Sequence, residues 1–293
     1  MLLDYVKLKE VKPALSGYIR DARLMLKQDS IPDDKVVHDV RVLMKKSRAV
    51  MRLIGSQLDE ESSKREYQSM RDVGRIMRTW RETSVHRKIL KSIRKKYPHI
   101  FVELKDFEKL NYLVKKQVQG PETREEIKSE LQEIIKILNK SDYRIRFLSI
   151  NNLDPRALLK ELDRTYNIVA DCYVTSRNNL KPASLHEFRK KTKDLLYQLY
   201  FFRPLKNQSV KTLEKQLDTI AQNLGKYNDL EVLVKALGYK RHNPDNSPAI
   251  NELIVLIREE QDRYLSKVWP IAYKVFCPSQ NLINVLGFKL LFV

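Results

Sequence analysis

The sequence contains two similar stretches of histidine, basic and apolar residues, and this internal repeat constrains the fold more than any other feature. Residues 37–54 read "VHDVRVLMKKSRAVMRLI" and residues 185–202 read "LHEFRKKTKDLLYQLYFF". An offset of 148 residues aligns the basic and the apolar positions of the two stretches. Each half of the chain is therefore predicted to build the same structural unit. The aligned basic pairs are His38 with His186, Arg41 with Arg189, and Lys45 with Lys193.

In the first stretch, the basic residues occupy one side of a predicted α-helix. They recur at intervals of three and four residues, which places them along one face at 100° per residue. The opposite face is apolar, as expected for an amphipathic helix that packs on a core. No carboxylate follows Asp39 on the basic face, although exposed helix faces usually mix lysine with glutamate. The basic face holds His38, Arg41, Lys45, Arg48 and Arg52, and the apolar face holds Val40, Leu43, Met44, Ser47, Met51 and Ile54.

A second landmark follows each stretch at nearly the same distance. Glu82, in "TWRETSVHRKIL", lies 44 residues after the first histidine, and Asp229, in "KYNDLEVLVKAL", lies 43 residues after the second. Two landmarks in register argue against a chance similarity. We therefore predict two halves, residues 1–150 and 151–293, that meet near "LSINNLDPRAL".

The expected architecture is all-α, with a bundle of four helices in each half. Only 7 glycines and 11 prolines interrupt the 293 residues, and the periodic segments are rich in good helix formers. Ser184 and Glu187 have capping-box spacing, which predicts that the second basic helix starts at about Leu185. Asp33 and its neighbours can start the first basic helix. The expected helices span residues 11–29, 33–55, 62–96 and 121–140, and then 156–178, 184–203, 209–237 and 248–276.

The charge of the chain predicts a polyanionic partner. Lysine and arginine number 56, against 37 aspartate and glutamate residues, which gives a formal net charge of +19. Such a surplus destabilises a compact fold by self-repulsion unless a partner offsets it. Nucleic acid, an anionic membrane surface or a phosphate polymer is therefore expected, and a merely soluble basic protein is the alternative.

Cysteine usage and the two ends of the sequence indicate a cytoplasmic protein. Cys172 and Cys277 lie 105 residues apart and match no metal or redox spacing, which suits a reducing compartment. The N-terminal "MLLDYVKLKE" lacks the apolar core of a signal peptide. The apolar tail "NLINVLGFKLLFV" has 13 residues and is too short to span a bilayer, so we expect a docked helix or a frayed end.

The sequence carries no motif of an enzyme, and we expect a binding protein without a cofactor or metal. Its glycines are too far apart for a G-x-G-x-x-G motif or a P-loop. Its five histidines form neither an H-x-x-x-H nor an H-E-x-x-H pair, and its two cysteines cannot complete a zinc site. A G-x-S-x-G nucleophile elbow is also absent from the sequence.

The two landmarks together resemble the CHAD domain, the conserved histidine α-helical domain. Its pattern is V-H-x-x-R-V-x-x-[RK]-[RK]-x-R, followed by an R-D-L-D-V-like element, with the whole arrangement given twice. "VHDVRVLMKKSR" fits the first element, "NDLEVL" fits the second, and the resemblance covers nearly all of the chain. The resemblance implies two four-helix bundles related by a pseudo-twofold axis, with a basic channel between them that binds inorganic polyphosphate.

The resemblance assigns polyphosphate binding to basic residues of both copies, and a basic stripe in the first predicted helix can add to them. These residues are His38, Arg41, Lys45, Lys46, Arg48, Arg52, His186, Arg189, Lys190, Lys193, Arg20, Arg23 and Lys27. A further stripe in the third predicted helix consists of Arg71, Arg75, Arg78 and Arg81. For the stripes of the first and third predicted helices, an ordinary solvated face is the alternative.

Some residues depart from the CHAD pattern. Leu196 stands where the second copy should match Arg48, and Asp194 stands where a second basic residue should follow Lys193. The first landmark has Glu82, Thr83 and Ser84 in place of the favoured Asp-Leu-Asp. We therefore expect the first half to contribute more of the binding charge and the pseudo-symmetry to be imperfect at the ligand.

The basic stripe suits a linear polyphosphate, which offers evenly spaced charges and acceptor oxygens. The stripe from His38 to Arg52 spans 14 residue-to-residue steps, or about 21 Å of helix. Arginine binds phosphate bidentately, and lysine acts as a mobile point charge. Phosphate contact is predicted for His38 and His186 near their helix N-termini, with a helix-packing hydrogen bond as the alternative. For Tyr197 and Tyr200 we expect packing between the bundles instead of phosphate contact.

Two other functions remain open, a helical nucleic-acid-binding protein and a scaffold for acidic proteins. The sequence has no helix-turn-helix or zinc-finger signature, and the first stripe lacks aromatic residues for base stacking. Relatives of the CHAD domain are often fused to a triphosphate tunnel hydrolase, whose E-x-E-x-K motif is absent here. The resemblance thus implies the binding part alone, with a polyphosphate-metabolising enzyme as a candidate partner and polyphosphate granules as a candidate location.

Overall fold

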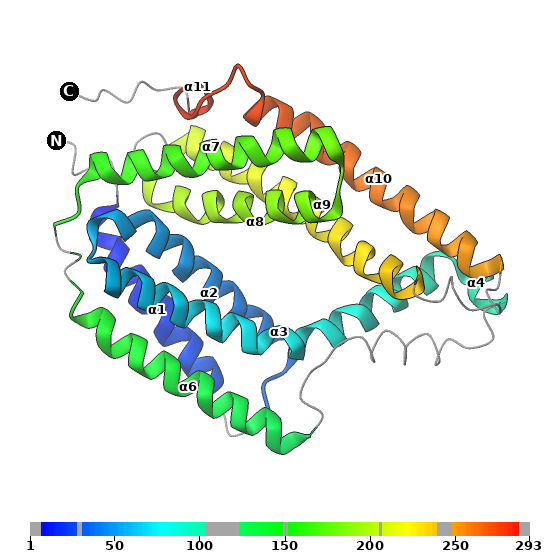
Figure 1. The fold of residues 1–293 in the computed structure, drawn as a ribbon, viewed down its shortest axis with the longest axis horizontal. Helices are drawn as coiled ribbons and strands as arrows, with labels where there is room; N and C mark the ends of the chain where they lie inside the picture. Colours follow the sequence, from blue (N-terminus) through cyan, green and yellow to red (C-terminus); the bar gives the residue numbers. More distant parts are fainter. Residues whose placement is uncertain are drawn as a thin grey trace.

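The computed structural model describes residues 7–27, 31–103, 123–148, 150, 152–204, 207–238 and 248–286, and these residues form an all-helical fold without strands (Figure 1). The long helices are α1 (Leu8–Leu26), α2 (Asp34–Ile54), α3 (Glu60–Lys96), α6 (Arg124–Arg146), α7 (Pro155–Asn179), α8 (Pro182–Leu199), α9 (Asn207–Gly238) and α10 (Pro248–Phe276). Short elements are η2 (Gly55–Gln57), α4 (Pro98–Glu103), η3 (Tyr200–Phe202) and α11 (Leu282–Leu286). Each of the eight predicted helices is confirmed, with ends that differ by up to two turns.

The long helices form two sets by their contacts (Figure 1). In the first set α1 packs on α2 and α6, and α3 packs on the same two helices. In the second set α8 packs on α7 and α9, and α10 packs on the same two helices. The sets meet where α2 touches α7 and α8 and where α3 touches α9. This arrangement places the two helices that carry the predicted basic stretches, α2 and α8, side by side.

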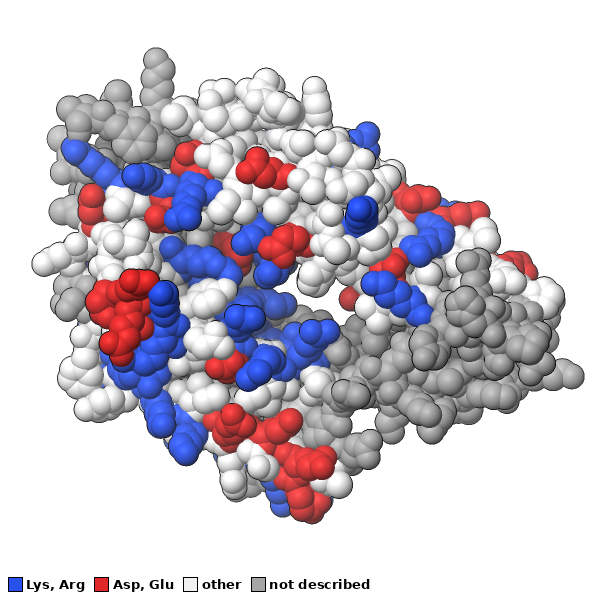
Figure 2. All heavy atoms as spheres, viewed as in Figure 1, with Lys and Arg blue, Asp and Glu red and all other residues white. Residues whose placement is uncertain are grey.

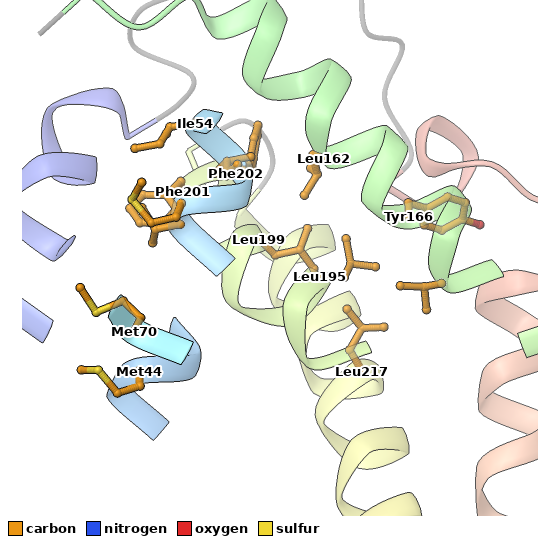
Figure 3. Packing of buried hydrophobic residues seen from close by; sticks show 14 of the residues in the cluster. Met44, Ile54, Met70, Leu162, Tyr166, Leu195, Leu199, Phe201, Phe202 and Leu217 are labelled. Carbon is orange, nitrogen blue, oxygen red and sulfur yellow. The ribbon is translucent and has the colours of Figure 1, made fainter. Parts of the chain in front are cut away.

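Burial follows the predicted apolar faces and joins the two sets. Met44 and Met70 of the first set and Leu195 and Leu217 of the second belong to one apolar cluster (Figure 3). Burying such side chains completely stabilises a fold by about 1.5–3 kcal/mol each. The predicted apolar face of α2 is confirmed, because all its members except the half-buried Leu43 are buried.

The far half of α3 leaves the first set and packs on the second. Leu90 and Ile93 of α3 join Ile100 of α4 and residues from the end of α9 and the start of α10 in a separate apolar cluster. Lys96, at the end of α3, forms an ion pair with Glu260 of α10. The 37-residue α3 therefore connects both sets of helices.

The starts of the two basic helices differ from each other. Asp33 caps α2 by accepting a hydrogen bond from the Val36 amide at 2.8 Å, as predicted. The predicted capping box at Ser184 is wrong, because α8 begins at Pro182, a turn earlier, without a side-chain cap. Proline is favoured at a first helical position, where its fixed φ suits the helix and its missing N–H costs nothing. Glu187 instead pairs with Lys190 at 3.0 Å.

A buried ion pair joins α3 to α6. Glu66 is fully buried, and the Arg144 guanidinium donates to both of its carboxylate oxygens, the longer bond measuring 3.3 Å. The same guanidinium donates to the hydroxyls of Ser69 and Ser141 at 3.2 and 3.3 Å. Because a buried charge is costly unless it is paired and hydrogen-bonded, this network makes the burial of Glu66 possible.

The ends of the sequence lie partly outside the described residues. Of the apolar tail, α11 is described, and its Leu282 and Leu286 are buried, which agrees with the expected docked helix. Residues 287–293 lie outside the described residues. In the part of the chain that the structure describes, we find no helix that is both long and apolar enough to span a bilayer. Cys172 and Cys277 are free thiols.

Candidate functional site

Lysine and arginine side chains gather in the middle of one face, over the region where the first set of helices meets the second (Figure 2). Carboxylates border this region but are few at its centre (Figure 2). The predicted basic residues of α2 lie at graded depths, since His38 is exposed and Arg41, Lys45, Lys46, Arg48 and Arg52 are half-buried. The basic face of α2 therefore lies partly against other helices and is not simply solvated.

Arg41 and Arg189, which the repeat aligns, each donate to a backbone carbonyl of the following long helix. Arg41 Nη1 donates to Gly74 O at 2.5 Å, and Arg189 Nε donates to Ala221 O at 3.2 Å. A Cβ added at Gly225 would lie 3.1 Å from Arg189 Nε, so the glycine leaves room for the guanidinium. Both arginines thus hold α2 on α3 and α8 on α9 in addition to carrying charge.

A cluster at the α2–α8 contact contains Arg48, Arg52, Tyr67 and Asp194. Arg52 forms an ion pair with Asp194 at 2.7 Å, and its guanidinium lies 4.9 Å from the centre of the Tyr67 ring while donating to the Tyr67 hydroxyl. Burial raises the pKa of Asp194, although Arg52 opposes that shift. Asp194, which departs from the CHAD pattern, therefore neutralises Arg52 of the opposite helix, α2.

The hydrogen-bonding groups of Arg48 are less well satisfied than those of its neighbour Arg52. Its Nε is buried and has no hydrogen-bond partner among the described residues. Burial lowers the pKa of Arg48, and the cations Arg52 and Arg71 lower it further, against the effect of Tyr67 and Asp194. A guanidinium stays charged in proteins, so an anion placed beside Arg48 would supply the missing acceptor and relieve the repulsion between the cations.

Most basic residues of α8 are paired with carboxylates. Lys190 pairs with Glu187 at 3.0 Å, and Lys193 pairs with Asp218 of α9 at 2.9 Å. His186 is exposed on one side, yet partial burial of its ring lowers its pKa, and the neighbouring cation Arg189 lowers it further. His186 is therefore mainly neutral near pH 7 in the absence of a ligand.

The two tyrosines of the second stretch have protein partners. Burial raises the pKa of Tyr197 to about 12, and Lys193 Nζ lies 5.8 Å from the centre of its ring. The Tyr200 hydroxyl donates to Glu10 of α1 at 2.6 Å. The contact of Tyr200 crosses from the second set to the first, which agrees with the expected packing role.

The basic residues of the α1 stripe differ in their surroundings. Arg23 forms an ion pair with Asp142 of α6 at 2.9 Å, whereas Arg20 and Lys27 are exposed and have no described ion pair. On α3, Arg71 and Arg78 are exposed, and Arg75 pairs with Asp72 at 3.3 Å. The side chains of residues 81–87, including Arg81 and Glu82, lie outside the described residues.

Sequence reasoning missed two polar partners in this region, Tyr67 and Asp218. Tyr67 lies 15 residues after Arg52 on another helix, and no sequence spacing signals this contact. Asp218 could have been found by extending the repeat alignment into the long helices. The described residues include no group of three or more histidine, cysteine, aspartate or glutamate side chains that could hold a metal ion.

The fold and this region define a class, namely all-helical proteins with two basic helices side by side at the junction of two helix sets. A family model for the CHAD domain matches residues 19–238, and the chain belongs to the CHAD domain family. This membership confirms the resemblance stated above.

Two solved structures are similar in fold. The CHAD domain from the plant Ricinus communis is 17% identical with a TM-score of 0.64, over 94% of this chain and 93% of that chain. PptA from Streptomyces chartreusis is 14% identical with a TM-score of 0.59, over 89% of this chain and 98% of that chain. A search of the curated proteins found no match.

Proposed function

We propose that this protein binds inorganic polyphosphate without transforming it, in a basic channel between two four-helix bundles that arose as an internal repeat. The hydrogen bonds from Arg41 and Arg189 to backbone carbonyls, which we call the two anchors, support the repeat. Their acceptor carbonyls lie 33 and 32 residues further along the chain. This difference of one residue equals the difference between the 44- and 43-residue spacings of the two landmarks. An approximate twofold axis between α2 and α8 would relate the two anchors.

The observation that carries the proposal is the unsatisfied cation cluster around Arg48. Its buried Nε lacks an acceptor, and Arg52 and Arg71 crowd it with like charge. Phosphate oxygens are acceptors that carry the required negative charge, and partly desolvated contacts to guanidinium groups are stronger than those in bulk water. Successive phosphates along a chain could follow α2 from this cluster towards His38. Recruitment to polyphosphate granules and a partner enzyme remain predictions.

Calorimetric titration with polyphosphates of defined chain length tests the proposed function. We expect stoichiometric binding of long chains and displacement of any bound duplex DNA by polyphosphate at matched charge concentration. Affinity for every polyanion falls with salt because counterions are released, so salt dependence alone does not separate the ligands. Equal competition by duplex DNA would favour the nucleic-acid-binding alternative, and absence of polyphosphate binding would rule out the proposal.

The state of His186 predicts how binding depends on pH. A bound anion favours the protonated ring and raises its pKa from a value that lies below the usual 6.5 in the free protein. The gain in affinity is then complete below the free-state pKa and is lost as the pH rises through the bound-state pKa. We expect polyphosphate to bind about two- to tenfold more tightly at pH ~5 than at pH ~7 through this group.

His186→Gln provides the comparison for this pH profile. Protonation of the polyphosphate itself and of the other histidines affects both proteins alike, so the difference between the two profiles isolates the imidazole. The variant should show a flatter dependence of the dissociation constant on pH. Superimposable profiles would mean that His186 does not contact the ligand and would leave the helix-packing alternative.

A further inference from the structure

The repeat alignment makes the two sides of the proposed channel chemically unequal. The second landmark and the anchor carbonyls both align α3 with α9 at an offset of 147 residues, since Glu82 matches Asp229 and Gly74 matches Ala221. At this offset the arginine row of α3 has no basic counterpart on α9. The aligned pairs are Arg71 with Asp218, Arg75 with Gln222, Arg78 with Gly225, and Arg81 with Asn228.

Asp218 of α9 has the opposite charge to the residue of α3 with which it aligns, Arg71. Its Oδ1 accepts from Lys193 Nζ at 2.9 Å, and its Oδ2 accepts from Gln222 Nε2 at 2.6 Å, so both oxygens are oriented. Lys193 is the aligned counterpart of Lys45, and the residue of α3 that aligns with Asp218 is Arg71. The Asp218 side chain is 42% exposed and that of Lys193 is 23% exposed. The pair is thus accessible, and another anion could replace the carboxylate.

We propose that Asp218 is a specificity-determining residue that competes with the ligand for Lys193. On the α2–α3 side the residue that aligns with Asp218 is the cation Arg71, so a phosphate chain binds first along α2 and α3. The chain engages Lys193 only by displacing the Asp218 carboxylate. This inference rests on the proposed function, and it explains how a pseudo-symmetric channel can hold its ligand on one side in preference to the other.

A double-mutant cycle on Asp218 and Lys193 tests this competition by calorimetry with long-chain polyphosphate. Asp218→Asn keeps the size of the side chain and frees the lysine, and we expect about two- to fivefold tighter binding, which lies within the range measured for accessible ion pairs. Lys193→Gln alone should weaken binding less than twofold, because the lysine is already occupied. The Asp218→Asn/Lys193→Gln variant should lose the whole gain and match Lys193→Gln.

Glu259→Gln is the matched control, because it neutralises another accessible, paired carboxylate and adds the same charge. Glu259 pairs with Arg263, and its neighbour Arg258 contacts Glu231, thirteen residues beyond Asp218 on α9. That separation is about 20 Å along the helix, beyond the screening length of about 8 Å at physiological salt. The affinity for polyphosphate should therefore change less in Glu259→Gln than in Asp218→Asn.

The outcomes separate this inference from the proposed function. If the wild-type protein does not bind polyphosphate, the proposed function fails and the inference fails with it. If the wild-type protein binds but Asp218→Asn shifts the affinity no more than Glu259→Gln does, the inference alone is wrong. The same conclusion follows if the gain from Asp218→Asn survives in the double variant, because Lys193 would then play no part in it.

Discussion

Reversing the charges of Lys45 and Arg71 together is expected to weaken polyphosphate binding by about a hundredfold or more while the protein stays folded. Each substitution to glutamate removes a cation from the α2–α3 side and adds a repulsive charge. Hydrogen bonds to charged groups contribute about 1.5–3 kcal/mol each, and 1.4 kcal/mol corresponds to a factor of ten. Lys45 is half-buried and Arg71 is exposed, so neither substitution opens a cavity in the core.

The choice of these two residues follows from the contacts of their neighbours. Arg41 also belongs to the predicted site, but its hydrogen bond to Gly74 O holds α2 on α3. Reversal of Arg41 would therefore mix a loss of binding with a loss of stability. Calorimetry measures the affinity of the Lys45→Glu/Arg71→Glu variant, and far-ultraviolet circular dichroism during heating checks that its fold is retained.

A matched variant is available on α6. Lys136 and Lys140 are exposed, lie four residues apart, and belong to a helix that contacts α1 and α3 and lies on their far side from α8 (Figure 1). Lys136→Glu/Lys140→Glu changes the net charge by the same amount, and it should reduce the affinity less than tenfold. A similar loss in both variants would mean that the net charge governs binding, and a site on α2 and α3 would then be excluded.

The helices could be predicted from the sequence because their determinants are local. Apolar residues at intervals of three and four positions define the buried face of α2, and the side chains that the pattern selected, such as Met44 and Ile54, are buried. The start of α8 was predicted wrongly because two local signals compete there. Pro182 begins the helix a turn before the capping-box residues Ser184 and Glu187 can do so.

The role of each cation could not be predicted, since its partner comes from a distant part of the chain. Arg23 pairs with Asp142, 119 residues away, and Arg52 pairs with Asp194 of the other set. A regular spacing on one helix reveals which side chains share a face. It does not reveal which carboxylates or carbonyls of other helices meet that face, so a uniform stripe in the sequence becomes a mixture of structural and available cations.

The proposed internal repeat carries more information about the proposed site than the basic stripe of α2 does. Arg41 and Arg189 contact the next long helix at nearly equal spacing along the chain. This spacing determines which residues of α9 align with which residues of α3. Once that alignment is known, the departures from symmetry identify the residues that make the two sides of the proposed channel different. Asp194 and Asp218 are such departures, and each one neutralises a basic residue of the predicted site.

Arg144→Met is expected to have the largest effect on stability among the substitutions considered, lowering the free energy of unfolding by about 3–5 kcal/mol. Glu66 is fully buried, and Arg144 supplies its two charge-assisted hydrogen bonds and contacts two serine hydroxyls of the same network. Methionine retains much of the length of the arginine side chain but leaves the Glu66 carboxylate without its main partner. Among the described residues, only Arg65 Nε, 3.5 Å from Glu66 Oε1, would remain beside the carboxylate, and removing one partner of a buried ion pair typically costs that much.

The variant Glu66→Leu/Arg144→Met distinguishes a charge effect from a packing effect. Removing both charges leaves apolar side chains of similar size, so the free energy of unfolding should recover most of the loss seen in Arg144→Met. Urea unfolding of the three proteins, followed by circular dichroism, measures these differences. If the double variant were as unstable as Arg144→Met, the loss would arise from packing between α3 and α6. Helix α3 also carries Arg71 and the carbonyl that accepts from Arg41. The measured loss therefore gives the contribution of the α3–α6 contact to the stability of the helix that carries part of the proposed binding surface.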